Sequence, residues 1–170
     1  MQSANKLPEP DPFTRDEFLA WRAFLRVHAH VTGELDRRMT EANGLSLDQY
    51  GVLITLVSAP GSQLRMGELG ARRLVSPSKI SRVIDELERH GLVRRTRDPE
   101  DGRSFLATLT PRGLRKLREA QVTHHAVVRE RFLQPLGTDQ VEQLAEIWDT
   151  AVPGVVGAEV WPPAELRSHG

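Results

Sequence analysis

Between residues 46 and 109, three short helical patterns are followed at once by two short strand patterns, with no long linker among them. In the third helical pattern, the apolar residues Ile80, Ile84 and Leu87 recur at the spacing of one helix face. A helix set after a tight turn and followed by a hairpin is the order of a winged helix-turn-helix, which presents that helix outward. The predicted helices are 46–58, 65–72 and 77–90, and the predicted strands are 92–97 and 104–109.

The helix predicted over 77–90 has clear start and stop signals. Ser76 can cap its first turn, and Pro77 fits the first helical position because it has no backbone N–H to leave unpaired. Gly91 ends the helix, because glycine adopts the left-handed conformation at little cost. Residues 98–103, Asp-Pro-Glu-Asp-Gly-Arg, are rich in turn formers and predict a tight loop between the strands, which we call the wing.

Long helical patterns flank this segment on both sides. The first runs from about residue 13 to residue 42, and two more cover 111–134 and 138–152. A helix of roughly 30 residues is much longer than the usual ~11–12, and a small domain alone does not cover it. We therefore expect a second subunit or a second long helix against it. The predicted fold class is mainly α (α+β), a winged helix-turn-helix with long N- and C-terminal dimerisation helices.

The net charge of zero hides an uneven distribution. Residues 65–118 contain 14 of the 23 Lys and Arg residues but only 7 of the 23 Asp and Glu residues. This excess of positive charge indicates a segment that meets a polyanion such as nucleic acid. On charge alone, a basic face that is merely solvated remains an alternative.

The charges on the helix 77–90 are graded along its length. Lys79 and Arg82 lie in its N-terminal half, whereas Asp85, Glu86 and Glu88 lie in its C-terminal half, where they would repel phosphates. The helix dipole and the free N–H groups also favour phosphate at the N-terminus. The pattern predicts that this end enters the DNA groove, although an ordinary amphipathic helix is the alternative. The DNA-contacting residues predicted here are Ser76, Pro77, Ser78, Lys79 and Arg82.

Arginines flank the predicted wing. An arginine at a hairpin tip can enter the minor groove, where the negative potential is strongest. Asp101 suits such a site as a partner that holds the Arg103 guanidinium in place, or simply as a turn residue. We therefore add Arg97, Asp101 and Arg103 to the predicted DNA-contacting residues.

The run GLVRRTRDPEDGR (91–103) followed by LTPRG (109–113) resembles the MarR family of bacterial regulators, and the resemblance extends over about 13–152. It implies an obligate homodimer on a pseudo-palindromic DNA site, with recognition helices in successive major grooves and wings in the flanking minor grooves. Gly102 stands where many members have Arg or Lys, so this wing carries one positive charge fewer. The positions that match the family's DNA contacts are Ser76, Ser78, Lys79, Arg82, Asp101 and Arg103.

These observations predict a bacterial, cytoplasmic transcriptional regulator, most often a repressor in this family, that binds a double-stranded DNA operator sequence-specifically as a homodimer. The two half-sites are expected about one helical turn, ~34–36 Å, apart. The predicted organisation is a flexible N-terminal arm (1–12), a dimerisation helix (13–45), the winged helix-turn-helix DNA-binding domain (46–110), C-terminal dimerisation helices (111–152) and an irregular tail (153–170).

The resemblance also implies a small aromatic anion as an effector that releases DNA. Trp21 with a nearby arginine and histidine would suit a phenolic carboxylate, by stacking and ion pairing. The alternative is that Trp21 belongs to the core and the charged residues to the surface. The residues predicted for effector binding are Arg15, Trp21, Arg22, Arg26, His28 and His124.

Other classes of protein fit the sequence poorly. The chain has no cysteine, which excludes disulfides, thiolate zinc sites and thiol redox sensing. It contains none of the common catalytic motifs, so we expect no enzyme and no cofactor. No apolar run approaches ~18 residues, so we expect no membrane contact.

Two further alternatives concern metal and protein partners. His28 and His30 do not share a helix face, and neither do His124 and His125, so we expect no metal site. A winged helix that binds protein instead of DNA is disfavoured by Lys79, Arg82 and Arg103.

Overall fold

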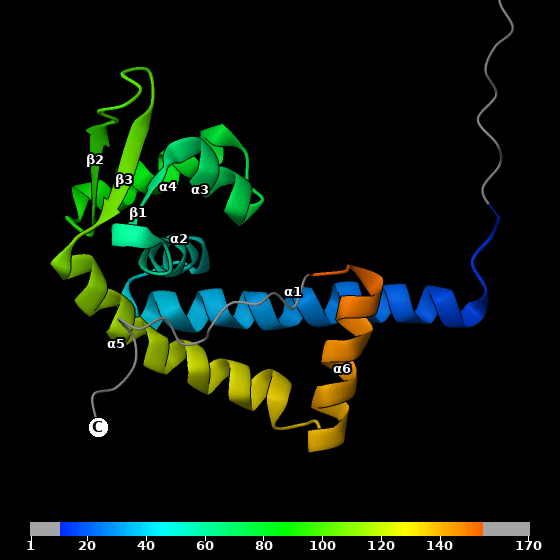
Figure 1. Ribbon diagram of the computed structural model, residues 1–170. Helices are drawn as coiled ribbons and strands as arrows, with labels where there is room; N and C mark the ends of the chain where they lie inside the picture. The colour runs from blue at the N-terminus through cyan, green and yellow to red at the C-terminus, as the bar shows by residue number, and fades with distance from the viewer. Residues whose placement is uncertain (1–10, 155–170) are drawn as a thin grey trace, which may run out of the picture.

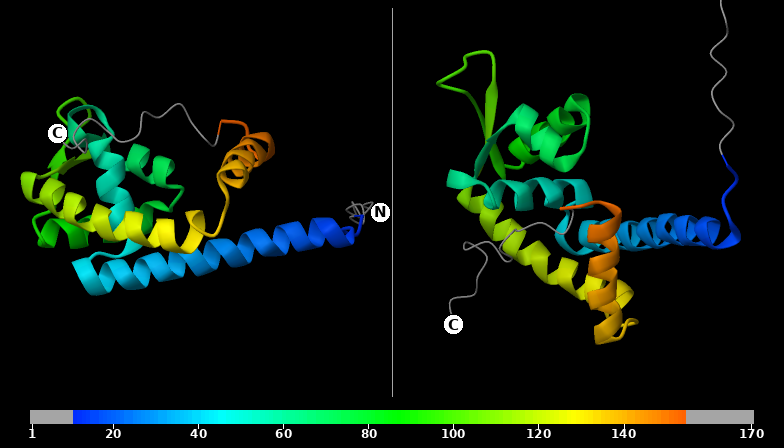
Figure 2. Two further views of the ribbon diagram at one scale, coloured as in Figure 1. Left: turned by 90° about the horizontal axis from the view of Figure 1, so that it is seen from below. Right: turned by 45° about the vertical axis from the view of Figure 1, so that its right-hand side comes forward.

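The computed structural model describes residues 11–154, so nearly all of the predicted arm (1–12) and of the predicted tail (153–170) lies outside the described residues. A long helix, α1 (Arg15–Asn43), runs beneath a lobe that contains the remaining short helices and the sheet (Figure 1). The next long helix, α5 (Pro111–Val128), lies alongside α1, and α6 (Thr138–Ala151) crosses α1 (Figure 2). The mainly α fold with flanking long helices is therefore confirmed. No helix within residues 11–154 is long and apolar enough to cross a bilayer.

Helix α1 begins and ends at strong local signals. Thr14 and Glu17 form a reciprocal capping box, with Thr14 N donating to Glu17 Oε2 over 2.7 Å. Gly44 ends the helix in the left-handed conformation, at φ 63°. Only the C-terminal part of α1 enters the core, through Leu35 and Met39. The N-terminal part leaves apolar side chains exposed in the single chain.

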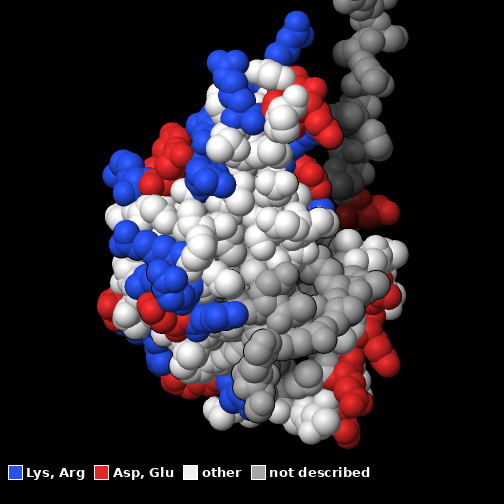
Figure 3. Space-filling view, turned by 60° about the vertical axis from the view of Figure 1, so that its left-hand side comes forward, with Lys and Arg blue, Asp and Glu red and all other residues white. Residues whose placement is uncertain are grey.

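The lobe follows the predicted order, with one strand added. Its elements are α2 (Leu47–Val57), η1 (Pro60–Ser62), β1 (Gln63–Arg65), α3 (Met66–Arg73), α4 (Pro77–Arg89), β2 (Val93–Arg97) and β3 (Phe105–Leu109). The antiparallel sheet has the order β1-β3-β2, with Leu64 and Arg95 on either side of Ala107. The wing joins β2 to β3 and forms the upper projection in Figure 3. Strand β1 was not predicted, because three residues carry no usable periodicity, and Arg65 ends β1 where a helix start was expected.

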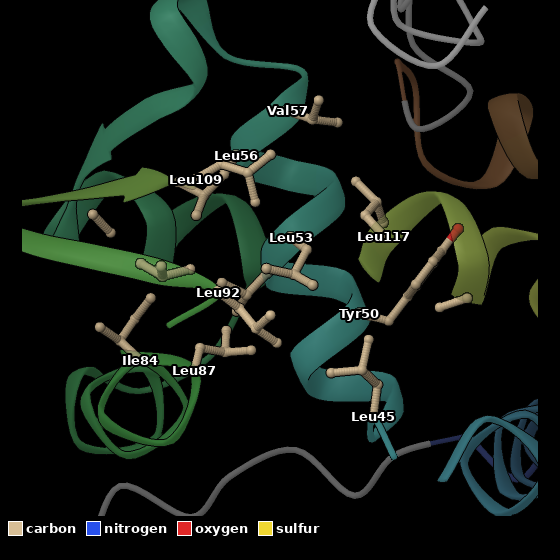
Figure 4. Close-up of a cluster of buried hydrophobic side chains, with 14 of the residues drawn as sticks. Leu45, Tyr50, Leu53, Leu56, Val57, Ile84, Leu87, Leu92, Leu109 and Leu117 are labelled. Carbon is tan, nitrogen blue, oxygen red and sulfur yellow. The ribbon is translucent and has the colours of Figure 1, made fainter. Parts of the chain in front are cut away.

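The core joins the lobe to the long helices. Leu53 and Leu56 of α2, Ile84 and Leu87 of α4, and Leu117 of α5 are all completely buried (Figure 4). The predicted apolar face of α4 is therefore confirmed. Helix α2 packs against α4 on one side and against α5 on the other, and so positions these two helices relative to each other (Figure 4).

The start of α5 lies very close to β2. A Cβ on Gly113 would be 2.1 Å from the carbonyl oxygen of Leu92, so only glycine fits there. Thr110 caps α5, and its Oγ1 also donates to the Gly91 carbonyl over 2.8 Å. The predicted helix 111–134 is α5 continued by a π-helical segment, η2 (Arg129–Leu133), which the sequence pattern did not distinguish.

Candidate nucleic-acid interface

The N-terminus of α4 is exposed and carries the polar residues expected of a recognition helix. Ser76 caps the helix, with its Oγ accepting from Lys79 N over 3.3 Å, and Pro77 occupies the first turn as predicted. The hydroxyls of Ser76 and Ser78 lie 3.2 Å apart. Arg82 is exposed one turn further along, its Nε donating to the Ser78 carbonyl over 3.4 Å. Hydroxyl and guanidinium donors thus gather at the end where the helix dipole favours phosphate.

Lys79 has a protein partner that the sequence did not predict. Its Nζ lies 2.7 Å from Asp48 Oδ2, at the start of α2. Both side chains are nearly half exposed, so solvent screens the pair and it contributes little to stability. A phosphate bound at Lys79 would therefore compete with Asp48 for this ammonium group.

The acidic half of α4 braces neighbouring elements. Asp85 Oδ1 lies 3.3 Å from Arg95 Nη1, and Glu88 Oε1 accepts from the Arg95 backbone N–H over 2.9 Å. Glu86 accepts from Gln49 Nε2 of α2 over 2.9 Å. The acidic residues of α4 therefore hold β2 and α2 in place, in the half of α4 that is predicted to stay out of the groove.

Asp101 shapes the wing through its backbone. Its Oδ1 accepts from the Arg103 backbone N–H over 3.1 Å, and its Oδ2 from Ser104 Oγ over 2.6 Å. The Ser104 hydroxyl and then the Arg103 N–H hold the pKa of this carboxyl below its usual value. Between Asp101 and the Arg103 guanidinium no ion pair exists, so the expectation that Asp101 holds that guanidinium is wrong. The turn role is the one observed.

Arginines also support the wing from β2. The Arg97 Nη1 donates to the Gly102 carbonyl over 3.3 Å, inside the wing itself. Arg95 lies over the Phe105 ring, with its guanidinium carbon 4.4 Å from the ring centroid. Arg97 is thus partly committed to the wing's own backbone, while Arg103 makes no side-chain bond to another residue described in the structure.

The base of the wing contains an ion pair that sequence reasoning missed. Asp98 is 4% exposed, and within residues 11–154 it is the one buried charged residue. Its Oδ2 accepts from Arg65 Nε over 2.5 Å and its Oδ1 from Glu100 N over 2.9 Å. The Glu100 N–H, and then Arg65, lower the pKa of this carboxyl. The pair was not predicted because β1, the strand that brings Arg65 to the wing, was not predicted.

A recess of about 530 Å³ separates the wing from the helices, and Ser81 of α4 and Arg103 of the wing lie on its two sides. Arg65 and Arg95 also line it. In the space-filling view, Lys and Arg side chains gather on the wing and along one edge below it (Figure 3). Arginines of β1, β2 and the wing therefore line the same recess as Ser81 of α4, together with Glu68 of α3.

The six residues predicted to bind an effector do not form one site. Arg15, Trp21, Arg22 and Arg26 lie on the exposed part of α1, and Trp21 is 52% exposed instead of belonging to the core. His28 lines an apolar groove of about 640 Å³ whose walls include Phe24 and Trp148.

His124 lies elsewhere, stacked on Tyr50 of α2 with ring centroids 4.6 Å apart. Figure 4 shows Tyr50 extending from α2 toward α5. No group of three His, Asp or Glu side chains converges to hold a metal in the part of the chain that the structure describes.

An outward, capped helix with cations at its N-terminus, set beside an arginine-bearing wing, defines the class of winged helix-turn-helix nucleic-acid-binding proteins. A family model described as "MarR family" matches residues 43–104. The chain is 31% identical over 124 residues to YkoM, an uncharacterized HTH-type transcriptional regulator of Bacillus subtilis, covering 73% of this chain and 78% of YkoM. It is 27% identical over 137 residues to the transcriptional repressor MprA of Escherichia coli, covering 81% and 77% of the two chains.

Among solved structures, the chain is similar to Sco3205, a MarR family transcriptional regulator from Streptomyces coelicolor in complex with DNA. The TM-score is 0.79 at 31% identity, covering 89% of this chain and 96% of Sco3205. The chain belongs to the MarR family of DNA-binding transcriptional regulators, a family of regulators and not of enzymes.

Proposed function

We propose that this protein is a repressor that binds a pseudo-palindromic double-stranded DNA operator as a homodimer. The observation that carries the proposal is the exposed N-terminal half of α4, where Ser76, Ser78 and Arg82 surround a capped helix end. A helix placed in this way reaches base edges in the major groove, and an arginine there forms a bidentate pair with guanine. The structure of Sco3205 in complex with DNA supports DNA as the partner.

Arg103 is proposed to enter the minor groove beside the recognition helix. Its side chain borders the recess between wing and helices, and Asp101 fixes the backbone turn that presents it. A narrow minor groove attracts an arginine through its enhanced negative potential. The wing would then add affinity at positions that flank those read by α4.

The homodimer is supported by apolar side chains that the single chain leaves uncovered. On α1, Phe18, Trp21 and Leu25 are each about half exposed, and Ile147 of α6 is 56% exposed. A contiguous apolar surface of this kind marks an interaction site, and a second copy would bury it. Sedimentation analysis of the purified protein tests this: we expect a dimer, and Phe18→Asp should shift it toward monomer and weaken operator binding.

The repressor role is supported by the similarity to MprA, which is named a repressor. Binding to an operator that overlaps a promoter would block transcription. A reporter fused to the promoter bound in vivo should therefore be more active after deletion of the protein. Lower activity would identify an activator instead.

The reading of sequence by α4 is testable at Arg82. Arg82→Ala should lose roughly 1–3 kcal/mol of discrimination among operator variants, while nonspecific binding changes much less. Competition binding with matched and mismatched duplexes measures both the discrimination among operator variants and the nonspecific affinity. An equal loss on every duplex would make Arg82 a phosphate contact only.

A small aromatic acid is proposed as an effector that releases DNA. The apolar groove supports this, because it combines the rings of Phe24 and Trp148 with His28, a side chain able to pair with a carboxylate. In the proposed dimer a second copy borders the same face, so a ligand there would alter the spacing of the two recognition helices. A panel of phenolic acids added to the operator complex tests this, and His28→Leu should abolish any release.

A further inference from the structure

A buried carboxylate holds the point where β2 enters the wing. One carboxylate oxygen of Asp98 accepts a hydrogen bond from the Glu100 backbone N–H, and the other accepts one from the Arg65 guanidinium. The Asp98 N–H donates to the Ser104 carbonyl over 3.0 Å and closes the two ends of the wing. Because charged hydrogen bonds to a buried group are strong and directional, these contacts fix the start of the loop.

Arg65 reaches this carboxylate from the far edge of the sheet. The strand order is β1-β3-β2, so Arg65 of β1 bridges across β3 to the strand that leads into the wing. A second donor of the same guanidinium, Nη2, lies 3.0 Å from Glu100 Oε2, within the wing. The Arg65 side chain thus links β1 to two positions of the wing, Asp98 and Glu100.

We propose that Arg65 is a positioning residue for the wing, which fixes where Arg103 lies relative to α4. The inference rests on the proposed function, in which Arg103 enters the minor groove. Arg65 already has two carboxylate partners, so its own charge is offset before DNA arrives. If each of the dimer's two wings adopted the binding arrangement only about a third of the time without this tie, operator affinity would fall about tenfold, because both wings must be in place.

A charge-matched pair of variants separates positioning from electrostatics. Asp98→Asn and Glu100→Gln each remove one negative charge from the wing, and charge alone predicts slightly tighter DNA binding for both. In Asp98→Asn the amide oxygen can still accept from Glu100 N, but the amide NH₂ faces the Arg65 donor. Positioning therefore predicts about tenfold weaker operator binding for Asp98→Asn. It predicts unchanged or tighter binding for Glu100→Gln, because that side chain is 83% exposed and its amide oxygen can still accept from Arg65 Nη2.

Arg65→Lys provides a second variant that keeps the charge but cannot form the two-pronged contact. It should weaken binding like Asp98→Asn and leave the slope of log K against log salt unchanged. Arg103→Ala, by comparison, should weaken binding and reduce that slope by about two, one for each subunit of the dimer. In the DNA-free protein, hydrogen exchange at the amides of Asp98 and Ser104 should accelerate in Asp98→Asn and in Arg65→Lys.

The outcomes distinguish this inference from the function on which it rests. Weaker binding of Asp98→Asn and Arg65→Lys, with an unchanged slope and faster exchange, supports the positioning role. Normal binding or normal exchange of these variants, while Arg103→Ala is weakened, refutes the positioning role alone. A normal affinity of Arg103→Ala refutes the minor-groove role itself and this inference with it. Thermal unfolding of each variant confirms that the compared proteins are folded.

Discussion

His124 makes the stability of this protein depend on pH between about 7 and 5. The imidazole is stacked on the Tyr50 ring at the contact between α5 and α2, and its buried Nδ1 has no hydrogen-bond partner. Burial, and then the nearby His125, lower the pKa of His124 from 6.5 to about 4. The folded protein therefore keeps this ring neutral at pH values where the unfolded chain protonates it.

The sign and size of the effect follow from linkage. Between pH 6.5 and about 4 the unfolded state binds more protons at His124, so the free energy of unfolding falls as the pH falls. This difference amounts to about 2 kcal/mol between about pH 7 and about pH 5, and solvent screening of the partly exposed ring reduces it to roughly 1–2 kcal/mol. The stabilisation is fully present above about pH 7.

Urea unfolding at a fixed protein concentration, repeated at pH values from about 7 to about 5, measures this dependence. His124→Phe keeps a ring on Tyr50 but removes the titrating group, so it should lose roughly 1–2 kcal/mol less than the wild type on acidification. Tyr50→Phe is the matched control: it removes a buried hydroxyl without a partner and should keep the wild-type pH dependence at equal or higher stability. An equal acid loss in His124→Phe and in the wild type would refute the reasoning.

Three further substitutions have defined outcomes. Leu74 is 93% exposed and adopts a left-handed conformation at φ 53°. Leu74→Gly should therefore raise the free energy of unfolding by about 1 kcal/mol, and no gain would show that the turn is unstrained. Asp48→Asn frees Lys79 and removes a negative charge near the DNA, so gel-shift titration should show operator binding a few-fold tighter; weaker binding would give Asp48 another role. Gly113→Ala forces a methyl group against the Leu92 carbonyl, and denaturant unfolding should show a loss of at least ~2 kcal/mol, whereas a neutral result would mean that α5 can shift.

Local chemistry made most of the fold predictable. The helix ends at Ser46, Ser76 and Gly91 depend on single capping residues, and the observed helices begin or end within a residue or two of their predicted limits. The apolar face of α4 follows from spacing alone, because a helix repeats every 3.6 residues. Family membership followed from the same stretch, since the wing and the residues around it carry the most specific motif.

The parts of the site that escaped prediction all depend on tertiary contacts. The pairing of Lys79 with Asp48 requires α2 and α4 to lie side by side, which no local pattern encodes. The tie between Arg65 and Asp98 spans 33 positions and needs a three-residue strand that has no periodicity. Asp101 was expected to act on a side chain, yet an aspartate in a turn competes well for the backbone N–H two residues on, and this is the bond it forms.

Selection of bound duplexes from a random DNA library, with the purified protein at physiological salt, tests the central claim most directly. We expect an enriched inverted repeat whose half-site centres lie about one helical turn, ~10 base pairs, apart. The same selection with Arg82→Ala should relax the enriched positions within each half-site. Failure to enrich any duplex, or enrichment of a single site without a repeat, would contradict a homodimer that reads its operator with α4.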